Sequence, residues 1–335
     1  MFDFPTAIIN TVSTAQVILL MSIGPQTVEI KRLADFLEAV FKWEPTIKSL
    51  VLIDDAPEPR HFEELFGMAG GVHTHIIHHP RLGTGEGVWG ALTEGILLGL
   101  DWIAVHEPAA DLVLKIDTDA LVINKFISKA TAFLDSHSTV GLLGLHDQHC
   151  SGEHRSFQPW DRAMLNYSLP VGTRRTASGK RGLRWQLGRS FRRQHRILRS
   201  ARSNGYRWGE HCLGGAYLLR AQTVRDMHRR GFLMNPEFWR HSLVGEDVVV
   251  AAYVKAAGWH LHGFAAKNEI FGVEYVGLPF PPGELEARGY SIIHSVKNHP
   301  SWTEERIRSF FRGKREAATQ GCVAKPLYSD RKLGT

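Results

Sequence analysis

The chain has 335 residues, 43% of them hydrophobic and 22% charged, which is enough length and apolar content for a large buried core. Its three cysteines, Cys150, Cys212 and Cys322, are far apart and have no Cys-x-x-Cys spacing, so a disulfide framework and a zinc knuckle are both disfavoured. The net charge of +6 favours anionic partners in general and identifies none.

The beginning of the sequence lacks the features of a targeting segment. No lysine or arginine precedes Lys31, and the longest apolar run there, residues 17–23, is too short to cross a bilayer. We therefore expect neither a signal peptide nor a membrane anchor, and predict a cytoplasmic protein. The predicted organisation is one domain over residues 1–300 that contains a basic insertion at 151–210, followed by a C-terminal helix and basic tail at 301–335.

The first hundred residues alternate between strand and helix patterns. The predicted elements are strands at 15–22, 50–53 and 74–77 and helices at 28–43 and 88–99. This β-α-β order is typical of the start of a nucleotide-binding α/β fold. Glycines within 83–87 allow a tight turn near a ligand, but their spacing matches neither common phosphate-loop motif, so a plain loop is an equal alternative.

Later segments continue the same pattern. The predicted elements are strands at 112–116, 140–145 and 213–219 and helices at 124–136, 221–230 and 246–257. We therefore predict an α/β fold, a Rossmann-like mixed sheet flanked by helices and interrupted by a basic helical insertion.

Two acids follow the apolar strand at 112–116. Residues i and i+2 of an extended chain point the same way, so Asp117 and Asp119 can meet one hard cation that carries phosphate oxygens. Ligands of α/β sheets also collect at the carboxyl ends of the strands. The alternative is an acidic turn without a ligand, because aspartate is common where strands end.

A basic block separates the two halves of the core. Residues 162–209 contain no Asp or Glu, while cations accumulate at Arg174, Arg175, Lys180, Arg181, Arg184, Arg189, Arg192, Arg193, Arg196, Arg199, Arg202 and Arg207. An amphipathic basic helix is predicted over 183–206 from an apolar stripe of Leu183, Leu187, Phe191, Leu198 and Tyr206. Such a helix could contact an anionic membrane surface or grip an acidic saccharide. Alternatively, it packs its stripe on the core and exposes a solvated charged face.

Four features stand in a fixed order along residues 15–297. They are the Asp117-x-Asp119 pair, a strand opened by Gly214-Gly215, a helix opened by Gly245-Glu246-Asp247, and a late strand ending in His294-x-x-Lys297. Together they resemble the GT-A-fold, metal-dependent glycosyltransferases that use nucleotide-diphosphate sugars. The resemblance implies a nucleotide-sugar donor, with UDP favoured, a divalent Mn²⁺ or Mg²⁺ ion, and a saccharide or glycolipid acceptor.

The resemblance also implies roles for the residues at the metal. Asp119 would be a direct ligand, Asp117 would act through metal-bound water or the ribose, and His294 would complete the metal shell. Lys297 would neutralise the leaving phosphate, because breaking the sugar–phosphate bond leaves negative charge on the diphosphate. Without the acidic pair, His294 alone would be read as an ordinary histidine at a strand end.

On the acceptor side, the resemblance makes Asp247 the base of an inverting enzyme and gives Glu246 the task of holding the acceptor or ordering the loop. Acids are also favoured in a first helical turn without any catalysis. Aromatic rings suited to stacking on sugars are Trp160, Trp208, Trp239 and Trp302.

Position alone suggests the remaining donor contacts. Asp54 or Asp55, at the end of the second strand, occupies a place where such enzymes contact the base or ribose, and Arg81 follows the third strand. Gly214 and Gly215 would lie beside the donor sugar, or would simply let a strand begin without a side-chain clash.

Two other classes of protein share part of the pattern. A HAD-type phosphatase would use Asp117 as nucleophile and Asp119 as acid, but that fold normally begins with this strand, and no later Gly-Asp-x-x-x-Asp motif follows. A nucleic-acid-binding protein could use the arginines, but few aromatic residues lie between them, so we do not expect a nucleic-acid partner.

Overall fold

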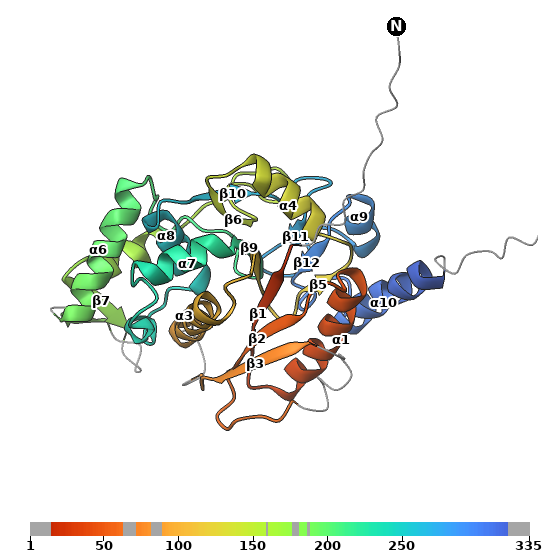
Figure 1. Ribbon diagram of the computed structural model, residues 1–335, viewed down its shortest axis with the longest axis horizontal. Coiled ribbons are helices and arrows are strands. Elements are labelled where there is room, and N and C mark those ends of the chain that lie inside the picture. Colours follow the sequence, from red (N-terminus) through yellow and green to blue (C-terminus); the bar gives the residue numbers. More distant parts are fainter. Residues whose placement is uncertain are drawn as a thin grey trace, which may run out of the picture.

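The computed structural model describes residues 15–62, 72–81, 89–158, 160–175, 181–185 and 188–320. A seven-stranded sheet runs through its centre in the order β10-β6-β9-β4-β1-β2-β3 (Figure 1). The strands are β1 (Val17–Ile23), β2 (Ser49–Asp54), β3 (His73–His78), β4 (Leu112–Ile116), β6 (Val140–Gly144), β9 (Ala216–Arg220) and β10 (His260–Gly263). Neighbouring strands are parallel except at β9, which is antiparallel to both β4 and β6. The predicted mixed α/β sheet is confirmed.

Helices cover both faces of this sheet (Figure 1). The helices of the described residues are α1 (Thr27–Trp43), α3 (Trp89–His106), α4 (Ile127–Ser136), α5 (Trp160–Ser168), α6 (Arg189–Ser203), α7 (Ala221–Arg229), α8 (Glu246–Ala256), α9 (Pro282–Ala287) and α10 (Glu304–Gln320). Alternate side chains of β1 pack into two separate hydrophobic cores. Leu19 and Met21 lie in the core that includes α1, whereas Ile18 and Leu20 lie in the core that includes α3 and α8. The two-residue repeat of a strand buried on both faces explains this division.

Helix α3 is longer than predicted, because Gly99 does not end it. A Cβ at residue 99 would lie 2.5 Å from Cδ1 of Leu20, so the glycine lets the helix lie close to β1. The apolar pattern continues to Ile103, which is buried. Strand β9 begins at Ala216, later than predicted, and leaves Gly214 and Gly215 in the loop before it.

A small second sheet positions the end of the chain's last strand. Its order is β11 (Phe271–Val273), β12 (Ile292–His294) and β5 (Leu121–Val122), with Ile293 paired to Leu121 in antiparallel register. The loop that holds Asp117 and Asp119 connects β4 of the large sheet to β5 of the small one. This connection brings His294 next to the acidic pair.

The basic segment differs from the single helix predicted over 183–206. It forms an antiparallel hairpin of β7 (Val171–Arg175) and β8 (Arg181–Trp185), followed by α6. Leu183 therefore belongs to a strand, and Leu187 lies outside the described residues. Phe191 and Leu198 are buried, and α6 packs against α8. The apolar stripe of α6 thus lies on the protein's own core, as the alternative interpretation predicted.

Near the end of the described chain, α10 packs beside α1 (Figure 1). Residues 321–335 and the glycine-rich segment 83–87 lie outside the described part of the chain. Within the described ranges, no helix is both long enough and apolar enough to cross a membrane.

Candidate active site

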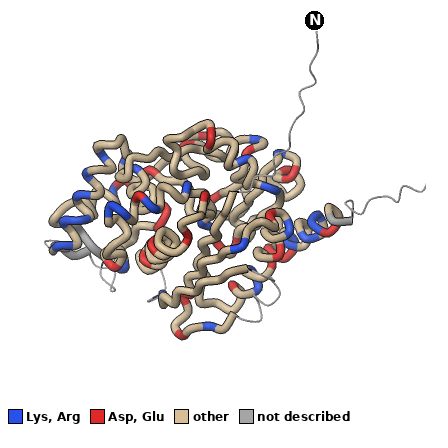
Figure 2. The backbone as a smooth tube through the Cα atoms, viewed as in Figure 1, with Lys and Arg blue, Asp and Glu red and all other residues tan. Residues whose placement is uncertain are grey.

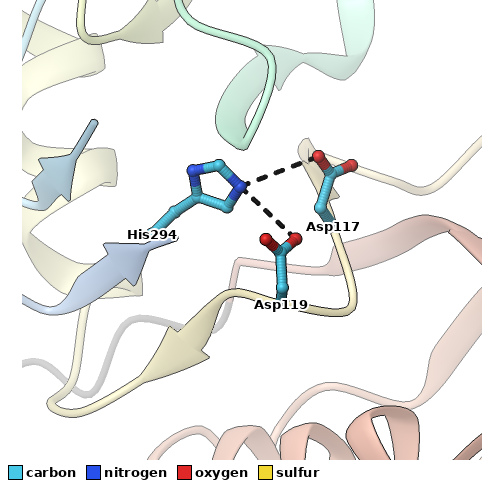
Figure 3. A group of neighbouring side chains, drawn as sticks. All are labelled: Asp117, Asp119 and His294. Atoms are coloured by element: carbon cyan, nitrogen blue, oxygen red, sulfur yellow. Dashed lines mark ion pairs between the residues drawn. The ribbon is translucent and has the colours of Figure 1, made fainter. Parts of the chain in front are cut away.

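Asp117, Asp119 and His294 form one cluster at the end of β4 (Figure 3). Nε2 of His294 lies 3.4 Å from Oδ1 of Asp119 and 3.9 Å from Oδ2 of Asp117. One donor atom from each residue lies within 4.8 Å of the other two, which is close enough for all three to reach a single ion. The structure therefore brings together the three residues predicted as metal ligands.

The orientation of His294 suits a metal ligand. Its Nδ1 is 2.8 Å from the carbonyl oxygen of Glu274, to which it can donate a hydrogen bond. This bond leaves Nε2 facing the two carboxylates, as in metal sites where a backbone carbonyl fixes the imidazole. Carboxylate oxygens and one imidazole form a donor set that accepts Mn²⁺ or Mg²⁺.

Asp119 is almost fully buried, and three groups hold its carboxylate. Oδ2 accepts a hydrogen bond of 2.6 Å from Ser295 and lies 3.1 Å from Nζ of Lys297. Burial opposes ionisation, but His294, Lys297 and Ser295 together hold the pKa of Asp119 far below its usual range. Burial likewise opposes the charged form of His294, but Asp119 and Asp117 raise the pKa of that imidazole. The Asp119 carboxylate is thus kept ionised.

Lys115 lies beneath the site and was not predicted from the sequence. It belongs to β4 and is 0% exposed, and its Nζ donates hydrogen bonds to Oδ1 of Asp117 (2.7 Å), Oε1 of Glu246 (2.6 Å) and the carbonyl of Gly214 (2.6 Å). Burial opposes its charge, but Asp117 and Glu246 together raise the pKa of Lys115. One buried cation therefore joins the metal-side acid to the acid at the start of α8. A lone lysine in an apolar strand, two residues before Asp117, was the available signal.

Glu246 and Asp247 lie in the first turn of α8, after the extended N-cap Gly245. Glu246 is bound by Lys115, whereas Asp247 is more accessible, with a side chain 15% exposed. Burial raises the pKa of Glu246 to about 7 despite the opposing charge of Lys115. Burial also raises the pKa of Asp247, although Lys115 and the Val248 amide lower it in part. A carboxylate with a raised pKa is suited to accept a proton near neutral pH.

His211 contacts Asp247 without neutralising it. The two side chains are 3.6 Å apart, from Nε2 to Oδ2. Nδ1 of His211 lies 2.7 Å from the carbonyl of Gly209, and Nε2 lies 3.0 Å from the guanidinium of Arg155. Burial and the charge of Arg155 lower the pKa of His211 to about 3, so this imidazole stays neutral at neutral pH.

Gly214 and Gly215 leave room for the site residues themselves. A Cβ at residue 215 would overlap the ring of His294, and a Cβ at residue 214 would lie 2.8 Å from Oε1 of Glu246. A side chain at residue 215 would thus displace His294, and one at residue 214 would displace the Glu246 carboxylate, a steric reason for glycine that sequence reasoning did not identify.

The acidic pair, His294 and the acids that begin α8 line one pocket of about 240 Å³. Its described lining is Trp89, Leu92, Asp117, Asp119, Trp160, Leu213, Gly214, Gly215, Gly245, Glu246, Asp247, Tyr275, Val276, His294, Lys297 and Asn298. Among the tryptophans suggested for sugar stacking, Trp160 is in this lining. Trp239 is 0% exposed and donates its Nε1 hydrogen to Tyr253, so it is a core residue and the suggestion was wrong for it.

Asp54 has a structural role in the described chain. Its carboxylate binds Arg60 and accepts hydrogen bonds from the backbone amides of Ala56 and Arg60. The side chain is buried, and these contacts close the loop after β2. The carboxylate of Asp54 is therefore already occupied by contacts within its own loop.

Asp55 and Arg81 contact each other. Arg81 Nη2 donates to Oδ2 of Asp55, which also accepts a 2.7 Å hydrogen bond from Ser22. The other carboxylate oxygen of Asp55 is buried and has no hydrogen-bond partner among the described residues, and the same is true of Nε of Arg81. Neither residue is in the described lining of the pocket. Each of these two residues thus keeps one buried polar atom that has no hydrogen-bond partner among the described residues.

No protein-family model and no curated protein matches the sequence. Among solved structures, the chain is similar to the apo structure of WbbM, a bifunctional glycosyltransferase, with a TM-score of 0.45 and 10% identity over 91% of this chain and 50% of that one. It is also similar to S. aureus TarS 1–349, with a TM-score of 0.38 and 13% identity over 75% and 58% of the two chains. For TarS 1–349 in complex with UDP, the TM-score is 0.36 and the sequence identity is 12%, over 72% of this chain and 55% of that one.

This chain spans only about half the length of those structures. At such TM-scores and identities, the likeness assigns neither a family nor an activity to it.

Proposed function

We propose that the protein is a glycosyltransferase that moves a sugar from a nucleotide-diphosphate sugar to an acceptor hydroxyl with the help of a divalent cation. The observation that supports this most is that the Asp117, Asp119 and His294 cluster and the acids that begin α8 line the same pocket. Asp117, Asp119 and His294 would hold Mn²⁺ or Mg²⁺. The ion would supply positive charge to the diphosphate as the sugar leaves.

The residues of the chain then divide the remaining work. Asp247 removes the proton from the acceptor hydroxyl while that oxygen attacks the anomeric carbon, the bond to the diphosphate breaks, and the nucleoside diphosphate leaves. Lys297, 43% exposed and 3.1 Å from Asp119, can approach the leaving phosphate. Glu246 is held by Lys115 and orders the loop beside Asp247. Attack with direct departure of the diphosphate inverts the anomeric centre.

We assign the nucleotide to the region of Asp55 and Arg81. Oδ1 of Asp55 is an acceptor and Nε of Arg81 is a donor, both without a partner among the described residues, and a pyrimidine edge presents a complementary donor and acceptor. Asp54 would contribute only by holding the loop. The proposal favours UDP, and it places the donor sugar beside Gly214 and Gly215, which line the pocket.

We assign the acceptor to the segment 151–210 of a domain spanning 1–300, with 301–335 as its C-terminal extension. Figure 2 shows Lys and Arg positions gathered along α6. Arg189, Arg192, Arg196 and Arg199 are exposed on this helix, and none has an acidic partner among the described residues. The proposed acceptor or its carrier is therefore anionic, such as a lipid-linked sugar at the cytoplasmic face of a membrane. Because the apolar stripe of α6 is buried, this contact would be electrostatic, without insertion.

Donor turnover tests the proposed function. Purified protein is incubated with UDP-, GDP-, CDP- and dTDP-sugars in Mn²⁺, in Mg²⁺ and after EDTA treatment, and release of the nucleoside diphosphate is measured. We expect metal-dependent release from one nucleotide class, and loss of that release in Asp119→Ala. Release of inorganic phosphate from a phosphoester without any nucleotide sugar would instead identify a phosphatase.

A further inference from the structure

Thr118, the residue between the two acids, is held through its hydroxyl and its carbonyl. Its hydroxyl donates a hydrogen bond to Oε2 of Glu29 in α1. Its carbonyl accepts a hydrogen bond of 3.1 Å from Nη2 of Arg308 in α10. Two helices from opposite ends of the chain therefore hold the middle of the loop that carries Asp117 and Asp119.

The two holding residues are themselves connected, so that the contacts form a closed ring. Glu29 Oε1 accepts a 2.6 Å hydrogen bond from Arg32, and Arg32 binds both carboxylate oxygens of Glu304 at 2.8 and 2.5 Å. Glu304 Oε1 accepts 2.8 Å from Nε of Arg308, which returns the path to Thr118. A ring of this kind restrains every member, because no single side chain can turn without breaking two contacts.

Arg308 is further fixed by a buried carboxylate. Its side chain is 9% exposed, and Nη1 donates 2.9 Å to Oδ2 of Asp35, which is also buried. Burial alone would raise the pKa of Asp35, but Arg308 and Arg315 hold it below the usual value, so the pair stays charged. The guanidinium is thus anchored on two sides by Glu304 and Asp35, and its third contact is the Thr118 carbonyl.

We propose that Arg308 is a positioning residue for the metal site: through Thr118 it sets the distance between the Asp117 and Asp119 carboxylates. This inference rests on the proposed function, because it assumes that the two acids bind the ion. Groups behind metal ligands typically change metal affinity by about 10–100-fold when they are removed. Arg308 would exert this effect from a helix that begins after the last strand of the site.

Arg312 offers a matched control on the same helix. It also donates a hydrogen bond to Asp35, at 3.0 Å, and it has no described contact with Thr118. Arg308→Gln and Arg312→Gln each remove one cation from Asp35, but only Arg308→Gln releases the loop carbonyl. Thr118→Val removes the hydrogen bond from the Thr118 hydroxyl to Glu29 and keeps the carbonyl that accepts from Arg308.

The test measures the binding of Mn²⁺ to the full chain. Free Mn²⁺ is monitored by its electron paramagnetic resonance signal, first without nucleotide and then with UDP. We expect the dissociation constant to rise at least about tenfold in Arg308→Gln and severalfold in Thr118→Val, and to stay within about twofold in Arg312→Gln. Arg308→Lys should recover part of the affinity, because an ammonium can still donate to Thr118. If Arg308→Gln does not fold, Arg308→Lys and Thr118→Val, which both keep a cation beside Asp35, are measured instead.

The outcomes separate this inference from the proposed function. If wild type binds Mn²⁺ and Arg308→Gln binds it equally well, Arg308 does not position the site, and the glycosyltransferase proposal stands. If Arg312→Gln loses as much affinity as Arg308→Gln, the effect comes from Asp35 and the inference is wrong. If wild type binds no Mn²⁺ with or without UDP, the metal site itself is wrong, and the role of Arg308 falls with it.

Discussion

Lys115 lies 2.6 Å from Glu246, although the two residues are 131 positions apart in the chain. The lysine is fully buried and also donates to Asp117, so one cation serves both the metal-side and the acceptor-side acids. Burial raises the pKa values of Glu246 and Asp247, and the charge of Lys115 opposes that rise at both residues. Lys115 therefore favours the ionised form of these two acids.

Lys115→Gln should shift the acid limb of the pH profile of kcat/KM to higher pH. Burial raises the pKa of Glu246 to about 7 and raises that of Asp247, while Lys115 lowers both. A base works only when ionised, so kcat/KM falls as pH drops through the raised pKa, and removing Lys115 raises that pKa further. The variant should thus lose more activity at pH 7 than at pH 9, measured as nucleoside diphosphate release.

Lys255→Gln is the control for this shift. Lys255, on α8, is largely buried like Lys115, but its carboxylate neighbour is Glu210, whereas Lys115 contacts Asp117 and Glu246. Its pH profile should match wild type. An unchanged acid limb in Lys115→Gln would mean that Lys115 does not tune the base.

Asp247→Asn should abolish transfer while nucleotide binding survives. The amide cannot take a proton from the acceptor hydroxyl, and loss of a general base typically costs about 10²–10⁴ in rate. The Asp117, Asp119 and His294 cluster is untouched, so UDP affinity in Mn²⁺ should stay near wild type by calorimetry. Proton NMR of the wild-type product should show an inverted anomeric centre. A retained configuration would exclude Asp247 as the base of a single displacement.

Gly215→Ala should remove metal-dependent activity. Because a Cβ there overlaps the ring of His294, the imidazole must move away from the two carboxylates. We expect weaker Mn²⁺ binding and slower turnover. Gly188→Ala is the control, since residue 188 has a φ of −75° and nothing within 4 Å of the added methyl. Normal Mn²⁺ affinity in Gly215→Ala would show that His294 does not complete the metal shell.

Replacing the exposed arginines of α6 should weaken the acceptor without affecting the donor. The four substitutions to Gln are at Arg189, Arg192, Arg196 and Arg199. We expect a higher acceptor KM and weaker binding to anionic liposomes, with the largest differences at low salt, because these contacts are exposed and screened. Arg193 is left in place, because its guanidinium donates to the side chain of Asn235.

A second quadruple variant controls for net charge. It changes four exposed lysines that are scattered elsewhere on the surface, Lys31, Lys42, Lys125 and Lys267, to Gln. Its acceptor KM and liposome binding should stay close to those of wild type. If both variants change acceptor KM and liposome binding equally, only the overall charge matters. If neither variant changes them, the α6 arginines are a solvated surface without a role in acceptor binding.

The parts of the site that could be predicted from the sequence are those encoded within a few neighbouring residues. Asp117 and Asp119 follow a recognisable apolar strand, and Asp247 opens a recognisable helix. Lys115 was missed because its significance depends on Glu246, which only the fold brings near. Arg308 was missed for the same reason, since its contact with Thr118 spans 190 positions.

Secondary structure was predictable to a similar extent. The central strands were found because each is an apolar run bounded by turn residues. The hairpin of β7 and β8 was not, because its arginine-rich strands lack an alternating apolar pattern. Gly99 was taken as a helix end, although it is a close-packing position against Leu20. Local patterns cannot distinguish these two uses of glycine.

A crystal structure with Mn²⁺ and UDP, phased at the manganese absorption edge, tests the central claim most directly. We predict one anomalous peak within coordination distance of the Asp119 carboxylate, Nε2 of His294 and the diphosphate oxygens, with Asp117 bound directly or through water. The uracil should lie against Asp55 and Arg81. A diphosphate bound away from Asp119 and His294, with no anomalous peak between them, would contradict a metal-dependent glycosyltransferase.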